Sequence, residues 1–277
     1  RFTYYCNFLR RTQFEIMKHF LKRENLGLCI KRSRYIKVHE FRHIFAISMI
    51  GDVNFFGDRT YFLPLYLYST DLKRQVSGDE TLRPECTPNF TAEFLQAVHE
   101  ALGAEPAPEE IFYYIYAVLY SPTYRKRYEE FLKIDFPRVP MPTDYALFKQ
   151  LSELGKELVD LHLLKHPSLS ETDVGFPVSG SNTVEKVRYD EENRRVYFNK
   201  EQYFGGVSKA VWEYRIGAYQ VAEKYLKDRK KRELFLEEIE HYRVVAKAIE
   251  RTIEVQGRIE EGIDIGFALN RCLKVQF

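Results

Sequence analysis

The sequence lacks the short motifs that mark common catalytic and nucleotide-binding sites. No GxxxxGK phosphate loop and no GxGxxG turn occurs, so neither a P-loop fold nor a dinucleotide-binding fold is supported. The GxSxG elbow of serine hydrolases is also missing. A metal-dependent nuclease would need an acidic residue on one strand and a Glu-x-Lys sequence on the next. The carboxylates of this chain do not form such a set. We therefore expect the chain to have no catalytic residues.

Cysteine is scarce, and long apolar runs are missing. The four cysteines, Cys6, Cys29, Cys86 and Cys272, are far apart, and no pair has the spacing of a zinc site. We expect reduced thiols and no bound metal. Without an apolar run or a signal peptide, we expect no membrane span and a cytoplasmic location. The start at Arg1 suggests a fragment of a larger protein.

An excess of charge of one sign is absent overall, because the net charge is only +2. The distribution is more informative. Basic side chains crowd the first 42 residues, where the acids are Glu15, Glu24 and Glu40, whereas acids gather in residues 233–240 and 250–264. This asymmetry predicts a basic side that faces a polyanion, although a solvated basic surface would give the same pattern.

The segment 111–164 organises the rest of the chain. An aromatic-rich apolar helix is predicted to about residue 120, followed by a charged amphipathic helix to residue 133. Prolines then pace residues 136–142, and a second amphipathic helix is predicted over 143–164. We interpret this segment as a helical spine.

Strand patterns lie on both sides of the spine. Residues 35–40, 42–50 and 61–68 are predicted strands, and Pro64 predicts either an edge position or a bulge in the last of them. Residues 69–89 are expected to be a polar loop, and residues 91–102 a helix ended by Gly103. After the spine, a turn at residues 190–193 between two strand patterns predicts a hairpin.

A long helix is predicted near the end of the chain. Its apolar residues are spaced three and four apart, which is typical of a coiled-coil seam. Packing on the spine or on a neighbouring domain would satisfy this pattern equally well. The seam residues are Ile239, Tyr242, Ala246, Ile249 and Ile253.

Basic residues interleaved with aromatic ones recur in both strand-rich parts. Arginine and lysine contact phosphates, and arginine can also read base edges in the major groove. His39 and His43 are four residues apart, but the strand pattern and the lack of a third ligand favour surface or phosphate-contacting histidines over a metal site. The candidate DNA contacts are Lys31, Arg32, Arg34, Lys37, Arg42, His43, Lys186, Arg188, Arg194, Arg195 and Tyr197.

Four sequence segments resemble the C-terminal specificity (target-recognition) domain of type ISP restriction-modification enzymes and their type IIG-like relatives. Two lie in the spine: SPTYRKRYEEFLKIDFPRVPMP at 121–142 and DLHLL at 160–164. The others are YFLPLYLY at 61–68 and VWEYRIGAYQV at 211–221. The resemblance spans nearly the whole chain, and Ala218 departs from it where a second glycine is expected.

The resemblance implies a DNA-binding module without catalysis of its own. It would read a short target in double-stranded DNA and direct the adenine-N6 methyltransferase domain of the same polypeptide, together with a linked translocase and nuclease. S-adenosylmethionine, ATP and Mg would serve the full-length enzyme, and this fragment would hold no cofactor. The methyltransferase signature and the helicase motifs are absent here.

We predict an α+β fold in which two β-rich blocks form a DNA-facing recognition region on the helical spine. The parts of this single compact domain are a basic, strand-rich part (1–110), the spine (111–165), a second β-rich block (166–220) and a C-terminal helical part (221–277).

The alternative is a protein-interaction module that docks on the methyltransferase or translocase through its long helix. Charge reversal at Arg32 and Arg34 would separate the two, since only the first requires these residues. A standalone nuclease is a third possibility, which a metal-dependent cleavage assay would test.

Overall fold

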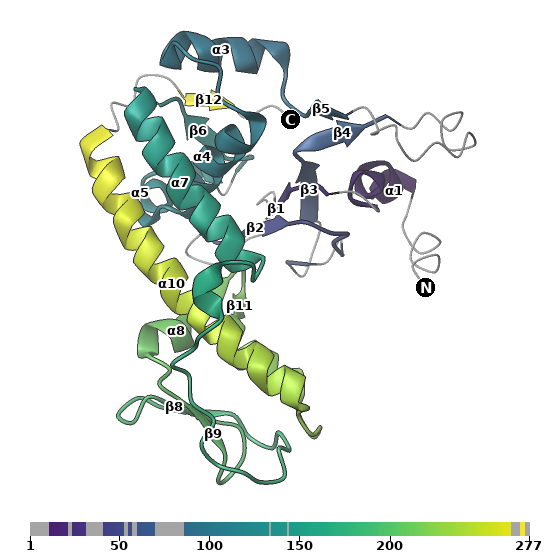
Figure 1. The fold of residues 1–277 in the computed structure, drawn as a ribbon, viewed down its shortest axis with the longest axis vertical. Coiled ribbons are helices and arrows are strands. Elements are labelled where there is room, and N and C mark those ends of the chain that lie inside the picture. Colours follow the sequence, from purple (N-terminus) through teal and green to yellow (C-terminus); the bar gives the residue numbers. More distant parts are fainter. Residues whose placement is uncertain are drawn as a thin grey trace.

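Helices and small antiparallel sheets together build the fold, which confirms the predicted α+β class (Figure 1). The computed structural model describes residues 11–21, 24–31, 41–52, 55–56, 60–69, 86–132, 134–142, 144–266 and 272–274. In chain order the elements are α1 (Arg11–Met17), η1 (Lys18–Phe20), β1 (Gly27–Lys31), β2 (Ile44–Ile47), β3 (Thr60–Pro64), β4 (Tyr66–Tyr68), β5 (Cys86–Pro88), α3 (Ala92–Leu102), α4 (Pro108–Tyr120), α5 (Pro122–Arg127), α6 (Glu129–Leu132), β6 (Arg138–Pro140), α7 (Tyr145–His162), η2 (Pro167–Leu169), β7 (Arg188–Asp190), β8 (Arg195–Tyr197), β9 (Tyr203–Gly205), α8 (Lys209–Glu213), β10 (Arg215–Ile216), β11 (Tyr219–Gln220), α9 (Val221–Lys227), α10 (Leu236–Gly266) and β12 (Cys272–Lys274).

The helices α4 and α7 form the centre of the predicted spine. Pro108 occupies the first turn of α4, where its missing N–H leaves no hydrogen bond unmade. The Asp144 side chain accepts a hydrogen bond from Leu147 N at 2.9 Å and so caps the start of α7. Nearly every apolar side chain of α4 is buried, and α4 and α7 contribute most of the first and largest core.

Between these helices the chain differs from the prediction. The expected single charged helix is interrupted at Tyr128, so α5 and α6 are two short helices. The proline-paced stretch also contains a strand, β6, which was not predicted. This strand pairs antiparallel with β12, with Val139 opposite Leu273. Pairing with the end of the chain is a long-range contact that local pattern cannot predict.

The first β block is a sheet of order β2-β1-β3 with a separate β4-β5 pair beside it. Pro64 lies at the end of β3, and β3 is an edge strand, as predicted. The helix α3 begins at its Thr91 cap and ends at Gly103 (φ 64°), again as predicted. The prediction of a loop throughout residues 69–89 is wrong at its end, because residues 86–88 form β5 and pair with β4.

The second β block contains the predicted hairpin. Strands β7 and β8 pair antiparallel around the turn that follows Asp190. A third strand, β9, pairs with β8 and was not predicted, because only three residues carry its pattern. In Figure 1 this sheet lies at one end of the long helices, and the β1–β3 sheet lies beside their middle.

The long helix α10 buries the predicted seam inside the chain. Ile239, Tyr242, Ala246 and Ile249 are each at most 5% exposed, and Ile253 packs against the same second core. The seam is therefore covered by the β7–β9 block and its neighbours. The seam is therefore not a surface through which α10 could dock on another domain, because its apolar side chains pack inside this chain.

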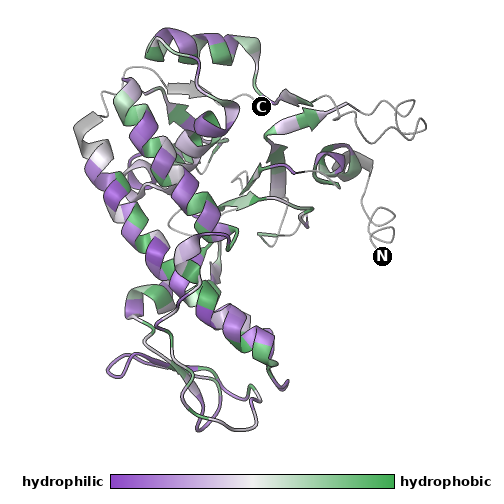
Figure 2. Ribbon diagram, viewed as in Figure 1, coloured by the Kyte–Doolittle hydropathy of each residue, from purple (hydrophilic) through white to green (hydrophobic). Residues whose placement is uncertain are grey.

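The later turns of α10 belong to the first core. Ala248, Val255 and Ile259 pack with the side chains of α4 and α7. Figure 2 shows hydrophilic and hydrophobic segments alternating along both α7 and α10, as expected for helices with one buried face. By contributing to both cores, α10 ties the second β block to the spine.

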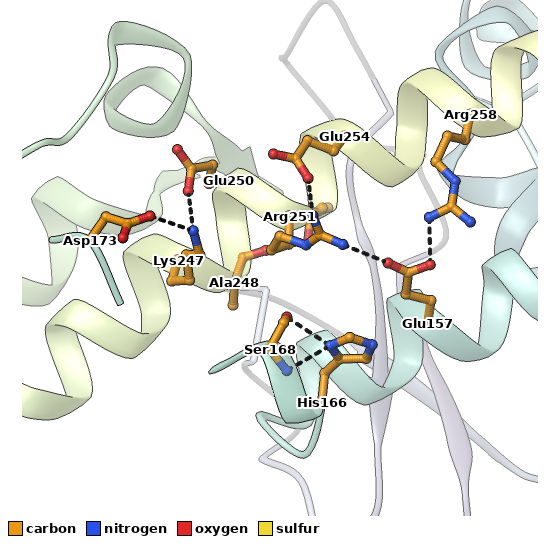
Figure 3. Close-up of polar contacts among 11 residues, drawn as sticks. Glu157, His166, Ser168, Asp173, Lys247, Ala248, Glu250, Arg251, Glu254 and Arg258 are labelled. Atoms are coloured by element: carbon orange, nitrogen blue, oxygen red, sulfur yellow. Dashed lines mark hydrogen bonds and ion pairs between the residues drawn. The ribbon is translucent and has the colours of Figure 1, made fainter. Parts of the chain in front are cut away.

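Polar contacts hold α10 against the spine (Figure 3). Glu157 of α7 accepts hydrogen bonds from Arg251 at 3.4 Å and from Arg258 at 2.7 Å. Further along α10, Glu260 accepts a hydrogen bond from Ser121 Oγ at 2.6 Å, at the junction of α4 and α5. These contacts fix the register of α10 on the spine, because each joins residues more than ninety positions apart.

A buried hydrogen-bonded chain crosses four elements. Ala46 N of β2 donates to the Tyr116 hydroxyl at 3.0 Å, which lies 2.6 Å from His162 Nδ1. His162 Nε2 lies 3.1 Å from Thr252 Oγ1, which donates to Ala248 O at 2.7 Å. Since Thr252 gives its hydroxyl proton to Ala248 O, it can only accept from His162. His162 therefore donates from Nε2 and accepts from Tyr116 at Nδ1. The network thus joins β2, α4, α7 and α10.

Candidate nucleic-acid interface

The β7–β9 sheet has two different faces. In its register Val196 lies between Tyr189 and Phe204, and all three belong to the second core. Val196 and Phe204 are fully buried. Because side chains alternate along a strand, the neighbouring positions lie on the other face. These residues are Arg188, Arg195, Tyr197 and Tyr203, here called the arginine–tyrosine face.

Each arginine of the arginine–tyrosine face lies over an aromatic ring. Arg188 Cζ is 4.2 Å from the centroid of Tyr197, and Arg195 Cζ is 4.4 Å from that of Tyr203. The two rings are 5.1 Å apart, so the four side chains form one continuous layer. Stacking on a ring holds a planar guanidinium in place while leaving its N–H edge available to a ligand.

One carboxylate, Asp190, lies at the end of this face, opposite Arg195. Asn193 donates to it from its side chain at 3.1 Å and from its backbone at 3.2 Å. These bonds, with the charges of Arg188 and Arg195, lower the pKa of Asp190. The carboxylate is committed to the turn, and within the described residues neither arginine forms an ion pair.

A cavity of about 600 Å³ lies where the first β block, the spine and the second β block meet. Arginines reach it from three separate parts of the chain. Arg42 precedes β2, Arg125 lies on α5, and Arg215 begins β10. Among the residues that the structure describes, one carboxylate, Glu213, also lines it. Sequence patterns could not indicate this cavity, because its walls come from residues far apart along the chain.

The chain matches the family model of the Type ISP C-terminal specificity domain over residues 1–257. It belongs to this family. The resemblance found in the sequence motifs is therefore confirmed. No curated protein matches the chain.

Three solved structures share the fold of this specificity domain. The ATP-dependent Type ISP restriction-modification enzyme LlaBIII bound to DNA has a TM-score of 0.66 and 20% identity over 86% of this chain. A nuclease-deletion mutant of the Type ISP enzyme LlaGI, in complex with a DNA substrate mimic, has a TM-score of 0.61 and 19% identity over 91%. The DrdV–DNA complex has a TM-score of 0.66 and 20% identity over 90%. The chain covers 16%, 18% and 26% of those three chains, respectively.

The sequence-predicted contacts of the specificity domain fall into separate groups. Arg188, Arg195 and Tyr197 come together on the arginine–tyrosine face, and the prediction missed Tyr203, because its strand is so short. Lys186 is exposed just before β7, and Arg194 is exposed in the turn with a positive φ of 52°. Both therefore flank this face.

The N-terminal candidates are less concentrated. Arg32, Arg34 and Lys37 lie outside the described residues. Lys31 ends β1 and is half-buried, and Arg42 is half-buried at the cavity. The two residues are thus brought near the same end of the first sheet, where Lys31 N donates to His43 O at 3.2 Å.

His43 is placed differently from the prediction. Its side chain is only 2% exposed, between the rings of Phe41 and Phe56. Burial, with the charges of Lys31 and Arg125, lowers the pKa of His43 to about 4. The prediction of a surface histidine is wrong, because the chain directly before β2 turns this side chain inward. A neutral, enclosed imidazole is not positioned to contact phosphate, so we drop His43 from the candidate DNA contacts.

Two other kinds of site gain no support within the described residues. No group of three His, Cys, Asp or Glu side chains there could hold a metal ion. None of the described helices is both long and apolar enough to cross a membrane.

Proposed function

We propose that this specificity domain binds double-stranded DNA, reads a short target and directs the adenine-N6 methyltransferase of the same polypeptide to it. The arginine–tyrosine face carries the proposal, since its guanidinium groups rest on rings and have no carboxylate partner among the described residues. The family assignment supports the same function. So do the fold neighbours, whose structures hold DNA or a DNA substrate mimic.

The chemistry of this face suits a nucleic-acid groove. Guanidinium N–H groups donate to phosphate oxygens, and an arginine can donate two bonds to O6 and N7 of guanine. A two-stranded β-ribbon fits the major groove, and the β7–β8 hairpin is the part of this three-stranded sheet that would enter it. Because stacking already restricts Arg188 and Arg195, less side-chain entropy is lost on binding.

The chemical steps would belong to other parts of the polypeptide. S-adenosylmethionine would supply the methyl group in the methyltransferase domain, and ATP and Mg would serve the translocase and nuclease. A cytoplasmic location would give the enzyme access to DNA. The present chain would contribute the choice of target.

Charge reversal on the arginine–tyrosine face tests the proposal. The double substitution Arg188→Glu and Arg195→Glu is expected to weaken duplex binding by about 100-fold or more near 100 mM salt, because phosphate contacts dominate affinity. The slope of log affinity against log salt should also become shallower, by about 0.9 for each phosphate that the variant no longer neutralises. Fluorescence anisotropy with a labelled duplex, repeated at several salt concentrations, measures both quantities.

Lys165→Glu provides the matched control. Lys165 is exposed after the end of α7, and its substitution makes the same change of charge per site. It should leave affinity and salt slope close to those of the wild type. Equal losses of duplex affinity in both variants would show that the effect comes from net charge alone. The assignment of DNA binding to this face would then be contradicted.

A further inference from the structure

The cavity at the meeting point of the three parts has a strongly positive lining. Of the described side chains that line it, three are arginines and one is a glutamate. Its volume of about 600 Å³ is in the range of small-ligand sites and exceeds the space that a phosphate group alone requires. In Figure 1, α8 and β11 lie beside α10, which supplies one wall.

Arg125 is the unusual member of this lining. Its side chain is only 4% exposed, although a buried arginine is normally paired with an anion. Its Nε donates to Leu119 O at 2.7 Å, and its guanidinium lies 4.6 Å from the centroid of the Tyr120 ring. Within the described part of the chain, its terminal nitrogens form no hydrogen bond and no carboxylate pairs with it. A buried cation of this kind at a cavity wall is placed to bind an anion that enters the cavity.

The walls around Arg125 are fixed by other contacts. Gly217 N donates to Arg42 O at 2.7 Å, which attaches the β10–β11 turn to the first β block. Gly217 has a φ of 58°, and a Cβ there would lie 2.9 Å from the His43 ring. On the opposite wall, Gln256 Nε2 donates to Tyr120 O at 2.9 Å. These contacts fix the backbone of the cavity walls, and the bond to Leu119 O holds the Arg125 side chain before any ligand enters.

We propose that this cavity binds a phosphate group, and that in the DNA complex it takes a backbone phosphodiester with its adjoining sugar. The guanidinium fork matches phosphate oxygens in geometry as well as in charge. The second half of the proposal rests on the proposed function, whereas the first half does not. The cavity lies apart from the arginine–tyrosine face along the chain and would act as a second contact.

Two exposed residues test the cavity with effects of opposite sign. Arg215→Gln removes one cation, and Glu213→Gln removes the carboxylate that opposes an anion. Inorganic phosphate is the first probe, with the melting temperature of the chain recorded against phosphate concentration at constant ionic strength. Phosphate should raise the melting temperature of the wild type. The apparent phosphate affinity should fall by about tenfold in Arg215→Gln and should rise in Glu213→Gln.

Duplex DNA is the second probe. Arg215→Gln should weaken binding by about tenfold and lower the salt slope by about 1, whereas Lys165→Gln should change neither. Glu213→Gln should strengthen binding, a gain that misfolding cannot produce. If neither cavity variant alters the response to phosphate or to DNA, the cavity is not a phosphate site and the inference is overturned.

The remaining outcomes separate this inference from the proposed function. Phosphate effects without DNA effects would leave a site for a free phosphorylated molecule and would overturn the phosphodiester assignment. DNA binding abolished in the Arg188/Arg195 variant but unchanged in Arg215→Gln would retain the proposed function and overturn the DNA role of the cavity. The reverse pattern would support the cavity and would contradict the assignment of DNA binding to the arginine–tyrosine face.

Discussion

Replacing Gly155 by alanine is expected to destabilise the fold by about 3–5 kcal/mol. Gly155 lies in the middle of α7, where α4 passes in close contact. A Cβ built on Gly155 would lie 1.9 Å from Tyr113 O and 2.6 Å from Tyr113 C. Both atoms are backbone, so no side chain can move aside. The two central helices would have to separate, which would loosen the whole first core.

Gly257→Ala makes the same chemical change where there is room for it. Gly257 lies in α10, is exposed, and has no atom within 4 Å of an ideal Cβ. Alanine is the better helix former by about 0.5–1 kcal/mol, so this variant should be slightly more stable than the wild type. Urea unfolding followed by circular dichroism measures both free energies. Similar small effects at the two glycines would contradict the close approach of α4 and α7.

Local signals account for what could be predicted from the sequence. Gly103 marks a helix end by its own backbone chemistry, and this predicted boundary is confirmed. Pro108 marks the start of α4 in the same way. The hairpin around residues 190–193 is set by its turn residues in the same way. The family motifs added the identity of the domain, which periodicity alone could not supply.

The errors arise where distant parts of the chain meet. The pairing of β6 with β12 joins residues more than one hundred and thirty positions apart, and no local pattern specifies it. His43 follows a strand pattern that gives no sign of which face is covered, and the second block covers it through Gly217. For the same reason, the sequence prediction included only one of the three cavity arginines among the candidate DNA contacts. Arg42 was selected by its basic neighbours, whereas Arg125 lies in the segment interpreted as the spine and Arg215 lies in a segment that carried only the family resemblance.

Acidification is expected to destabilise the protein well before its carboxylates are protonated. Burial, with the charge of Arg125, lowers the pKa of His162 to about 3, and the pKa of His43 is lowered to about 4. In the unfolded chain both imidazoles would titrate near pH 6.5. Between pH 6.5 and these folded values the unfolded state binds more protons. The free energy of unfolding therefore falls as the pH falls, by about 2 kcal/mol for each histidine between pH 7.5 and 5.

The variant His162→Leu should change both the level and the slope of this dependence. At pH 7.5 it is expected to lose about 2–4 kcal/mol, because it leaves the hydroxyls of Tyr116 and Thr252 without their shared partner. Its further loss between pH 7.5 and 5 should be smaller than that of the wild type by about 2 kcal/mol, since the contribution of His162 is gone while those of His43 and His241, whose pKa values are also lowered, remain. Urea unfolding at several pH values supplies both numbers.

The slope is the decisive quantity, because a merely weakened core would lower stability equally at every pH. His99→Gln serves as the control, since it removes an exposed imidazole on α3 that lies outside the buried network. It should follow the wild type throughout the pH range. A wild-type slope in His162→Leu would show that His162 takes up its proton without unfolding. The hydrogen-bonded chain from β2 to α10 would then have to tolerate a charged imidazole beside Arg125, which its enclosed position makes unfavourable.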